Sequence, residues 1–417
     1  MTLSATLLRA RRKYCSDGGK ALFAEVATKA LESDPARAFV RQQILTDASI
    51  LEQSQLREEA SRVWNCESPN TSNPFNSEVP IPGKTRLPNS QSFEGLETRL
   101  PTPPFVAEME DVTVLGPSGL GITSDSKFIK DTVASEWSSV SRIEKILSRS
   151  IQQNGYRKIR DCVRSPLASS DRRIPVATTL IPVWQNYYHW TLECLPKLLG
   201  IETYYEQTGE SPIILLPPDP SSWMRESLEL VSADWVELAN LQSGTTYVSQ
   251  FVAPSYPSPS RIECFWLRDR AQNAVDITEQ KENGYPSRIY VTRRNANVRR
   301  IKNEQEVLEV LSEFNIVPYA LETLSVTEQI RLFANAEFVI APHGAGLANL
   351  IYSTSPTVLE LFGHKEKTTF YRLSKMMGHE YHAMFCSTRF NDIVVDTSQL
   401  RVTVQNILQG NGNAIIE

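Results

Sequence analysis

The spacing of hydrophobic and polar positions divides the chain into four regions. Over residues 1 to about 62, apolar side chains recur at helical intervals, as at Ala21, Val26 and Ala30, which predicts an N-terminal helical appendage. Between 63 and 107, proline, serine, asparagine and threonine dominate, which predicts an irregular connector. Two α/β domains are expected after it, over residues 108–283 and 284–395, because short apolar runs there alternate with helical patterns.

The first α/β domain is predicted to begin with an antiparallel meander over residues 112–130, where short runs flank the turn Gly116–Gly119. A helix beginning at Tyr187 is expected to continue toward Tyr205 with a kink at Pro196, since proline removes a backbone donor. Other helices are expected near 136–152 and after Ser221. Further strands are predicted near residues 176–183, 213–216, 235–238 and 246–253.

In the second α/β domain, turn and capping residues separate the predicted strands and helices more regularly. Four strand-then-helix units follow one another, which predicts a parallel sheet with right-handed crossovers. Asn303 with Glu306, and Ser325 with Glu328, have the spacing of capping boxes. A further helix is expected to end at Gly378 and a strand to follow over 381–385, and the last helix, within 396–417, is expected to pack back on the first domain. The four strands are predicted over residues 289–292, 316–320, 338–341 and 358–361.

Composition narrows the class of protein. A chain of 417 residues exceeds one ordinary core, and its formal net charge of -5 argues against a nucleic-acid partner. Six cysteines without a C-x-x-C pair are expected to be free thiols. With no long apolar run and no signal-peptide pattern, a cytoplasmic location is expected. The basic stretch 7–13 could contact an anionic membrane surface, although a solvated start of a helix is favoured.

Two clusters at the carboxyl ends of predicted parallel strands are candidates for binding phosphate. His343, Gly344, Ala345 and Gly346 lie where a strand meets a helix, a position at which backbone N–H groups suit phosphate oxygens. A tight turn that merely needs glycine is the alternative. The second cluster is a loop with four arginines that could clamp a diphosphate, unless they form ordinary surface ion pairs. These arginines are Arg293, Arg294, Arg299 and Arg300.

Two further groups are candidates for chemistry. Glu360 lies in an apolar run, so its carboxylate needs partners, either a ribose diol or a cation in the core. His189 and Glu193 are one helical turn apart, so the carboxylate could orient the imidazole of a general base; a capping Asn186 with a packed aromatic turn is the alternative. There is no Asp-x-Asp, and the five histidines lack a metal-binding spacing, so no metal ion is expected.

The ordered set of motifs resembles glycosyltransferase family 61, which includes plant xylan-decorating transferases and protein O-linked N-acetylglucosaminyltransferases. The resemblance spans roughly residues 110 to 395. It is carried by Asn-Tyr-Tyr-His-Trp at 186–190 with Leu195-Pro196, Arg-Ile-Tyr-Val-Thr-Arg at 288–293, Arg299 with Asn303-Glu304, Glu328-Gln329-Ile330, and Pro-His-Gly-Ala-Gly-Leu-Ala-Asn at 342–349 with 358–360.

This resemblance implies a GT-B fold of two Rossmann-like domains and an inverting, metal-independent transfer of sugar. The donor would be a nucleotide sugar, often a UDP-sugar, held by the C-terminal domain. The acceptor would be a hydroxyl of a glycan, glycolipid or protein. By position, His189 with Glu193 would serve the acceptor as base, Glu360 would hold ribose, and the nucleotide sugar would be bound by Arg293, Arg299, His343, Gly344, Ala345, Gly346 and Asn349.

Two other functions fit parts of the same pattern. A polysaccharide pyruvyl transferase-like enzyme would also have two Rossmann-like halves, but would use an enolpyruvyl phosphate. A non-catalytic module that senses nucleotides or sugars would keep the arginine loop and the glycine turn without needing His189. A microbial enzyme that builds a polysaccharide, glycolipid or protein glycan is the setting that the resemblance favours.

Overall fold

The structure is a computed structural model that divides the described part of the chain into two compact units. Unit 1 is drawn from Met1–Phe75 and Pro101–Trp266, and unit 2 from Asn76–Leu100 and Leu267–Glu417. The expected helices of residues 1–37 and the basic stretch 7–13 lie outside the described residues. The described residues are 38–40, 44–45, 50–67, 78–81, 92–93, 95–135, 141–257, 260–277 and 284–410.

Unit 1 is built on one mixed sheet, with nine strands in the part of the chain that is described. Its order is β1-β7-β6-β5-β11-β8-β9-β10, and β2 also pairs with β5. The predicted meander is confirmed, since β5, β6 and β7 pair antiparallel, whereas β11, β8, β9 and β10 run parallel. The strands are β1 (Ile50–Leu51), β2 (Arg62–Asn65), β5 (Phe105–Gly116), β6 (Leu120–Ile122), β7 (Phe128–Ile129), β8 (Arg172–Thr179), β9 (Ile213–Leu216), β10 (Glu237–Asn240) and β11 (Gly244–Pro254).

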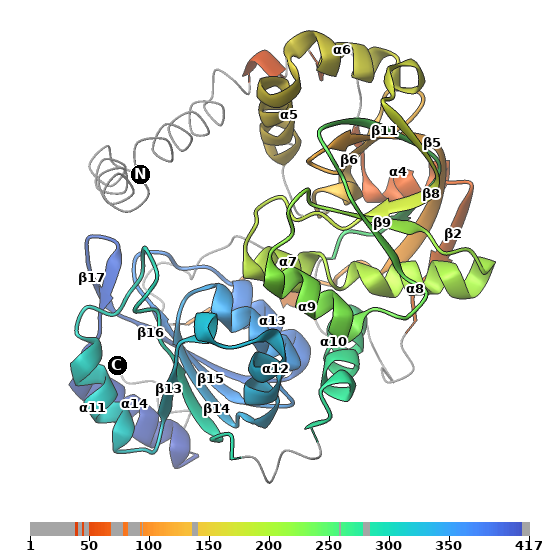
Figure 1. Cartoon of the computed structure of the whole chain (residues 1–417). Coiled ribbons are helices and arrows are strands. Elements are labelled where there is room, and N and C mark those ends of the chain that lie inside the picture. The colour runs from red at the N-terminus through yellow and green to blue at the C-terminus, as the bar shows by residue number, and fades with distance from the viewer. Residues whose placement is uncertain are drawn as a thin grey trace. The chain divides into compact units, whose positions relative to one another are not determined.

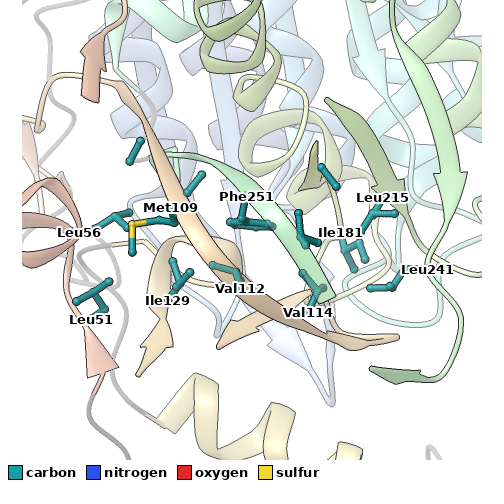
Figure 2. Close-up of a cluster of buried hydrophobic side chains, with 14 of the residues drawn as sticks. Leu51, Leu56, Met109, Val112, Val114, Ile129, Ile181, Leu215, Leu241 and Phe251 are labelled. Carbon is teal, nitrogen blue, oxygen red and sulfur yellow. The ribbon is translucent and has the colours of Figure 1, made fainter. Parts of the chain in front are cut away.

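The core of unit 1 follows from alternation along the two longest strands. Val112 and Val114 of β5 face the same cluster as Phe251 of β11, and all three are buried (Figure 2). Leu56 and Met109 extend this cluster toward the N-terminal strands. Each such side chain contributes roughly 1.5–3 kcal/mol by leaving water, so the paired strands β5 and β11 are held together by their side chains as well as by their hydrogen bonds.

The helices of unit 1 largely match the predicted ones. The expected kink at Pro196 is a complete break, because α7 ends at Glu193 and α8 begins at Lys197. Proline cannot donate the backbone hydrogen bond that a continuous helix requires there. The helices are α4 (Gln53–Glu59), α5 (Ser141–Asn154), α6 (Tyr156–Arg164), α7 (Tyr187–Glu193), α8 (Lys197–Thr208), α9 (Ser222–Val231) and α10 (Arg261–Ala274), which continues into unit 2, with 3₁₀ turns η1 (Lys130–Thr132) and η2 (Pro166–Ser169).

The helical expectation for residues 1–62 is wrong at two described places. Ile50–Leu51 form β1, which pairs with β7, and Arg62–Asn65 form β2, which pairs with residues 105–108 of β5. Both strands are too short to show alternation in the sequence, and only pairing with a distant strand gives them their structure. The predicted boundary at 62/63 therefore falls inside a strand.

Unit 2 contains a five-stranded sheet whose order is β13-β12-β14-β15-β16. Each neighbouring pair is parallel, as predicted. Figure 1 shows α11 and α14 on one face of this sheet and α12 and α13 on the other. The elements are β12 (Arg288–Val291), α11 (Glu304–Ser312), β13 (Val317–Tyr319), η4 (Leu321–Thr323), α12 (Val326–Asn335), β14 (Phe338–Pro342), η5 (Ala345–Tyr352), β15 (Thr357–Phe362), α13 (Thr369–Met377), β16 (Glu380–Phe385), β17 (Ser387–Arg389), β18 (Asp392–Val394) and α14 (Thr397–Leu408), with a separate pair β3 (Val79–Pro80) and β4 (Thr98–Arg99).

Three details of unit 2 test the predicted helix ends. The capping box of Ser325 and Glu328 is confirmed, and so is the left-handed residue Gly378 after α13. The capping box at Asn303 is wrong: its side chain makes no cap hydrogen bond. Instead its amide exchanges two hydrogen bonds with the backbone of Val395, the residue that follows β18.

The C-terminal helix does not pack as predicted. Leu400 and Val404 of α14 are buried in one cluster with Val307 and Leu311 of α11, so α14 belongs to the helical layer of unit 2. Part of the predicted connector also belongs to this unit. Phe93 is buried there among Phe362, Tyr371 and Phe385, in edge and stacked contacts.

Candidate functional site

The strand order of unit 2 marks a place for a ligand. The first strand, β12, lies inside the sheet, and the chain moves to β13 on one side before it crosses to β14 on the other. At such a switch point the loops after the two strands diverge and leave space at their carboxyl ends. The loop after β12 carries Arg293 and Arg299, and β14 leads directly into His343 and Gly344. The structure therefore brings the two predicted clusters to one edge of the sheet.

Arg293 and Gly344 are in direct contact. A Cβ atom placed on Gly344 would lie 2.0 Å from Nη1 and 2.8 Å from Cζ of Arg293. Gly344 has extended backbone with φ of -178°, a conformation open to any residue, so glycine is needed here for close approach. The guanidinium packs closely against the turn, which favours the ligand-binding interpretation over a turn that needs glycine for its dihedral angles.

The second arginine is held in an unusual conformation. Arg299 has φ of 59°, a left-handed value that non-glycine residues seldom adopt, and its N–H donates to the carbonyl of Asn391. Burial first, and then the positive charge of Arg299, lowers the pKa of Arg293 to about 10. The buried Nε of Arg293 donates to no acceptor in the described residues. Two cations held near one another at this edge favour an anionic ligand.

The other two arginines of the loop have structural partners. Arg300 forms an ion pair of 2.8 Å with Asp392, and its N–H also donates to that carboxylate. Arg294 is exposed and donates to the hydroxyl of Thr292. The salt-bridge interpretation therefore applies to Arg300, whereas Arg293 and Arg299 are the candidates for binding phosphate.

His343 is fixed by a buried polar chain. Its Nδ1 lies 2.5 Å from Oε1 of Glu360, and Tyr381 donates to the other carboxylate oxygen at 2.6 Å. Phe362 stacks on the imidazole, with ring centroids 5.4 Å apart. Glu360 is 0% exposed, and both of its oxygens have protein partners, so the geometry favours the core alternative over ribose binding. Glu360 orients His343.

The remaining residues of the turn support its shape. Asn349 is fully buried and donates to Gln329 of α12 and to the carbonyl of Gly346. A Cβ atom on Gly346 would lie 2.9 Å from Leu321, so glycine allows the turn to pack on η4. Ala345 is partly exposed and begins η5. Asn349 therefore contributes to the fold of the turn, and its predicted contact with nucleotide has no support in this geometry.

Replacing Gly344 by alanine tests the contact with Arg293. The new methyl group would displace the guanidinium, so affinity for a nucleoside diphosphate should fall roughly 10- to 100-fold, the loss of about one charge-assisted hydrogen bond. Calorimetric titration measures this. The double variant Gly344→Ala/Arg293→Ala should bind no more weakly than Arg293→Ala, because the two changes act through one contact. Additive losses would contradict the coupling.

The candidate base lies on unit 1, after the carboxyl end of β8. Asn186 caps α7 by accepting from the backbone N–H of His189 at 3.1 Å, so the capping interpretation is correct. The predicted contact between the imidazole and the carboxylate is also present, since His189 Nδ1 lies 2.7 Å from Oε2 of Glu193. The ring packs against Trp184 at 4.8 Å. Capping and orientation are thus parts of one arrangement.

Glu193 has two further partners that the sequence did not reveal. Arg142 of α5 donates to the same Oε2 at 3.1 Å, and the hydroxyl of Tyr256, just after β11, donates to it at 2.5 Å. Burial raises the pKa of Glu193, but the contacts with His189, Arg142 and Tyr256 outweigh it and lower the pKa. The carboxylate is therefore ionised. The helical spacing of Arg142 and the buried Ile146 indicates that they share one face of α5, but it does not identify Glu193 as the partner of Arg142.

A second buried group, the carboxylate of Asp131, contacts the segment that carries Tyr256. The carboxylate of Asp131 accepts from Gln53 and from the backbone N–H of Tyr256. Burial raises the pKa of Asp131 to about 6 and lowers the pKa of Lys197 to about 8. Lys197 donates to the carbonyl of Asp131 and lies 4.6 Å from the centre of the Tyr256 ring. These contacts fix Tyr256 at both its backbone and its ring.

Comparison of the sequence with protein-family models identifies the family that these sites resemble. The family model described as Glycosyltransferase 61 matches residues 187–359. The match begins at the first residue of α7 and ends within β15, so it includes His189, the arginine loop and the turn at His343. The chain contains a glycosyltransferase family 61 domain.

Curated relatives agree with this family 61 domain. The chain is 26% identical over 113 residues to the EGF domain-specific O-linked N-acetylglucosamine transferase of Gallus gallus, which is 26% of this chain and 21% of that protein. It is 30% identical over 100 residues to the Beta-1,2-xylosyltransferase of Arabidopsis thaliana, 20% of this chain and 19% of that protein. The matched region thus spans about a fifth of the length of each relative.

Further features of the described residues concern membrane-spanning helices, metal-binding groups and disulfides. Across the described ranges, no helix is long and apolar enough to cross a bilayer. Within the same residues, no three His, Cys, Asp or Glu side chains are grouped so as to hold a metal ion. None of the five described cysteines forms a disulfide, namely Cys66, Cys162, Cys194, Cys264 and Cys386, and Cys15 lies outside the described part.

Proposed function

We propose that this protein transfers a sugar from a nucleotide-diphosphate donor to a hydroxyl of a glycan, glycolipid or protein, with inversion and without a metal ion. The observation that carries the proposal is the guanidinium of Arg293 against Gly344 at the switch point of unit 2. The family 61 match supports the class of enzyme. Because the matched relatives transfer N-acetylglucosamine or xylose by name, a UDP-activated form of one of these sugars is the proposed donor.

The donor side of the reaction is proposed for unit 2. When the bond from the sugar to the diphosphate breaks, negative charge grows on the leaving oxygen, and preorganised cations and N–H groups stabilise that charge. Arg293 and Arg299 supply the cations. His343 is oriented by Glu360 and Tyr381, and as the imidazolium it would donate a second N–H from Nε2, since the Nδ1 proton already goes to Glu360. Arginine and histidine thereby replace the neutralisation that a metal ion provides in other transferases.

The acceptor side is proposed for unit 1. Since Glu193 is ionised and accepts from His189 Nδ1, the proton of the neutral imidazole is on Nδ1 and the lone pair is on Nε2. Nε2 is then the atom that accepts the proton of the acceptor hydroxyl. Inversion follows from a single displacement by that hydroxyl on the face opposite the diphosphate. A GT-B arrangement of the two units belongs to the same proposal.

A transfer assay tests this function. The purified full-length protein would be incubated with UDP-N-acetylglucosamine or UDP-xylose and with candidate saccharide, glycolipid and protein acceptors, and products would be identified by mass spectrometry and NMR. An anomeric linkage opposite to that of the donor supports the proposal. Transfer of pyruvate from phosphoenolpyruvate, or nucleotide binding with neither transfer nor hydrolysis of any donor, would instead favour the pyruvyl transferase or the sensing module.

A further inference from the structure

Three donors meet on one oxygen of Glu193. His189 Nδ1 lies 2.7 Å from Oε2, the Tyr256 hydroxyl 2.5 Å and Arg142 Nη2 3.1 Å. Histidine is the residue type among these three that can gain or lose a proton near neutral pH, because tyrosine is neutral and arginine stays protonated. The proton affinity of the His189–Glu193 pair therefore depends on the two neighbours that share the oxygen with His189.

Arg142 is held in this place by more than the ion pair. Its side chain is 8% exposed, and the guanidinium carbon lies 4.5 Å from the centre of the Trp184 ring and 5.4 Å from that of Tyr256. Trp184 in turn packs against His189. Arg142 lies outside residues 187–359, the part of the chain that matches the family model. A cation fixed this rigidly acts on Glu193 without the cost of ordering a mobile side chain.

The charges have a definite consequence. A lone buried carboxylate beside an imidazole would retain the proton on the ring and would leave no free lone pair at neutral pH. A guanidinium on the same oxygen cancels most of that negative potential while leaving the hydrogen bond in place. The imidazole is then oriented by Glu193 without being locked in its charged form, which is what a base needs near neutral pH.

We propose that Arg142 is a positioning residue that acts through Glu193 and keeps His189 able to accept a proton at neutral pH. The inference rests on the proposed role of His189 as base. The charged and titratable groups that bear on the pair come from four elements and two connecting segments. They are Glu193 and Tyr188 on α7, Arg142 on α5, Tyr256 after β11, Lys197 on α8 and Asp131 in η1, with the thiol of Cys194 between α7 and α8.

Removing the charge of Arg142 is expected to raise the proton affinity of the His189–Glu193 pair. In Arg142→Gln the His189–Glu193 pair should bind its proton at a pH about one unit higher. Ring NMR of histidine-labelled full-length protein measures this without any substrate, and His189→Gln assigns the signal. The acidic limb of the pH profile of kcat/KM should move to higher pH by the same amount. Arg142→Lys, which keeps the charge, should restore most of the original midpoint.

Matched variants separate this role from a structural one. Arg160→Gln removes an arginine of α6 that pairs with its exposed neighbour Asp161 and lies over the ring of Tyr156, and should leave the midpoint unchanged. If Arg142→Gln does not fold by circular dichroism, Arg142→Met removes the charge while retaining a stem that packs on Trp184. An unchanged midpoint in a folded charge-removing variant overturns the inference. A shifted midpoint in a protein without transferase activity supports the role of Arg142 and contradicts only the proposed function.

Discussion

Replacing His189 by alanine is expected to lower the rate of sugar transfer by roughly 10²- to 10⁴-fold, the usual contribution of a positioned general base. The physical reason is the arrangement on α7, where Glu193 fixes the proton on Nδ1 and leaves Nε2 to accept the proton of the acceptor hydroxyl. Nucleotide binding should be unchanged, because the proposed diphosphate site is on unit 2. Steady-state transfer assays and calorimetric titration of UDP measure the two quantities separately.

His382→Ala is the matched control for this result. His382 is a partly exposed histidine of β16 that forms a hydrogen bond with the exposed Glu380, and its loss should leave both quantities near those of the unchanged protein. A His189→Ala variant that transfers sugar at the original rate would remove the base from the account and would favour the sensing module.

Alanine in place of Arg293 or Arg299 is expected to have the second large effect. Each change should lower kcat roughly 10²- to 10³-fold, as loss of a preorganised charge donor does in other enzymes, and should weaken binding of UDP. Each guanidinium balances charge that develops on the diphosphate as the sugar leaves. The loss should therefore appear in kcat as well as in KM, which initial rates at several donor concentrations resolve.

Arg401→Ala is the control for the arginine variants. Arg401 is an exposed arginine of α14 paired with Glu313, and exposed pairs contribute little to stability. The transfer rate and the affinity for UDP should therefore stay within about twofold of those of the unchanged protein. Equal losses in Arg401→Ala and Arg299→Ala would show that net charge, and not a site at the switch point, governs binding.

The parallel sheet of unit 2 could be predicted because its inner strands β12, β14 and β15 are largely apolar and helical patterns lie between the strands. The short strands β1 and β2 could not, since their structure comes from pairing with residues at least 40 positions away. The packing of α14 was missed for a similar reason. Its buried residues Leu400 and Val404 show which face is covered but not which helix covers it.

Some contacts of the candidate site could likewise be predicted from the sequence, and others could not. Spacing alone brought His189 and Glu193 together, because one helical turn fixes their distance. The contact of Arg293 with Gly344, and the chain from His343 through Glu360 to Tyr381, join separate strands, so their geometry required the fold. Glu360 shows the limit most clearly: the sequence predicted a buried carboxylate with partners, and only the structure shows that those partners are His343 and Tyr381.

Calorimetric titration of the full-length protein with UDP, GDP and CDP in the presence of EDTA tests the central claim most directly, with Arg299→Ala titrated beside it. The account predicts saturable binding of one nucleotide that persists in EDTA and is lost in the variant. No binding of any nucleotide at millimolar concentration, or binding that requires a divalent metal, would contradict a diphosphate site built from arginines and a glycine turn.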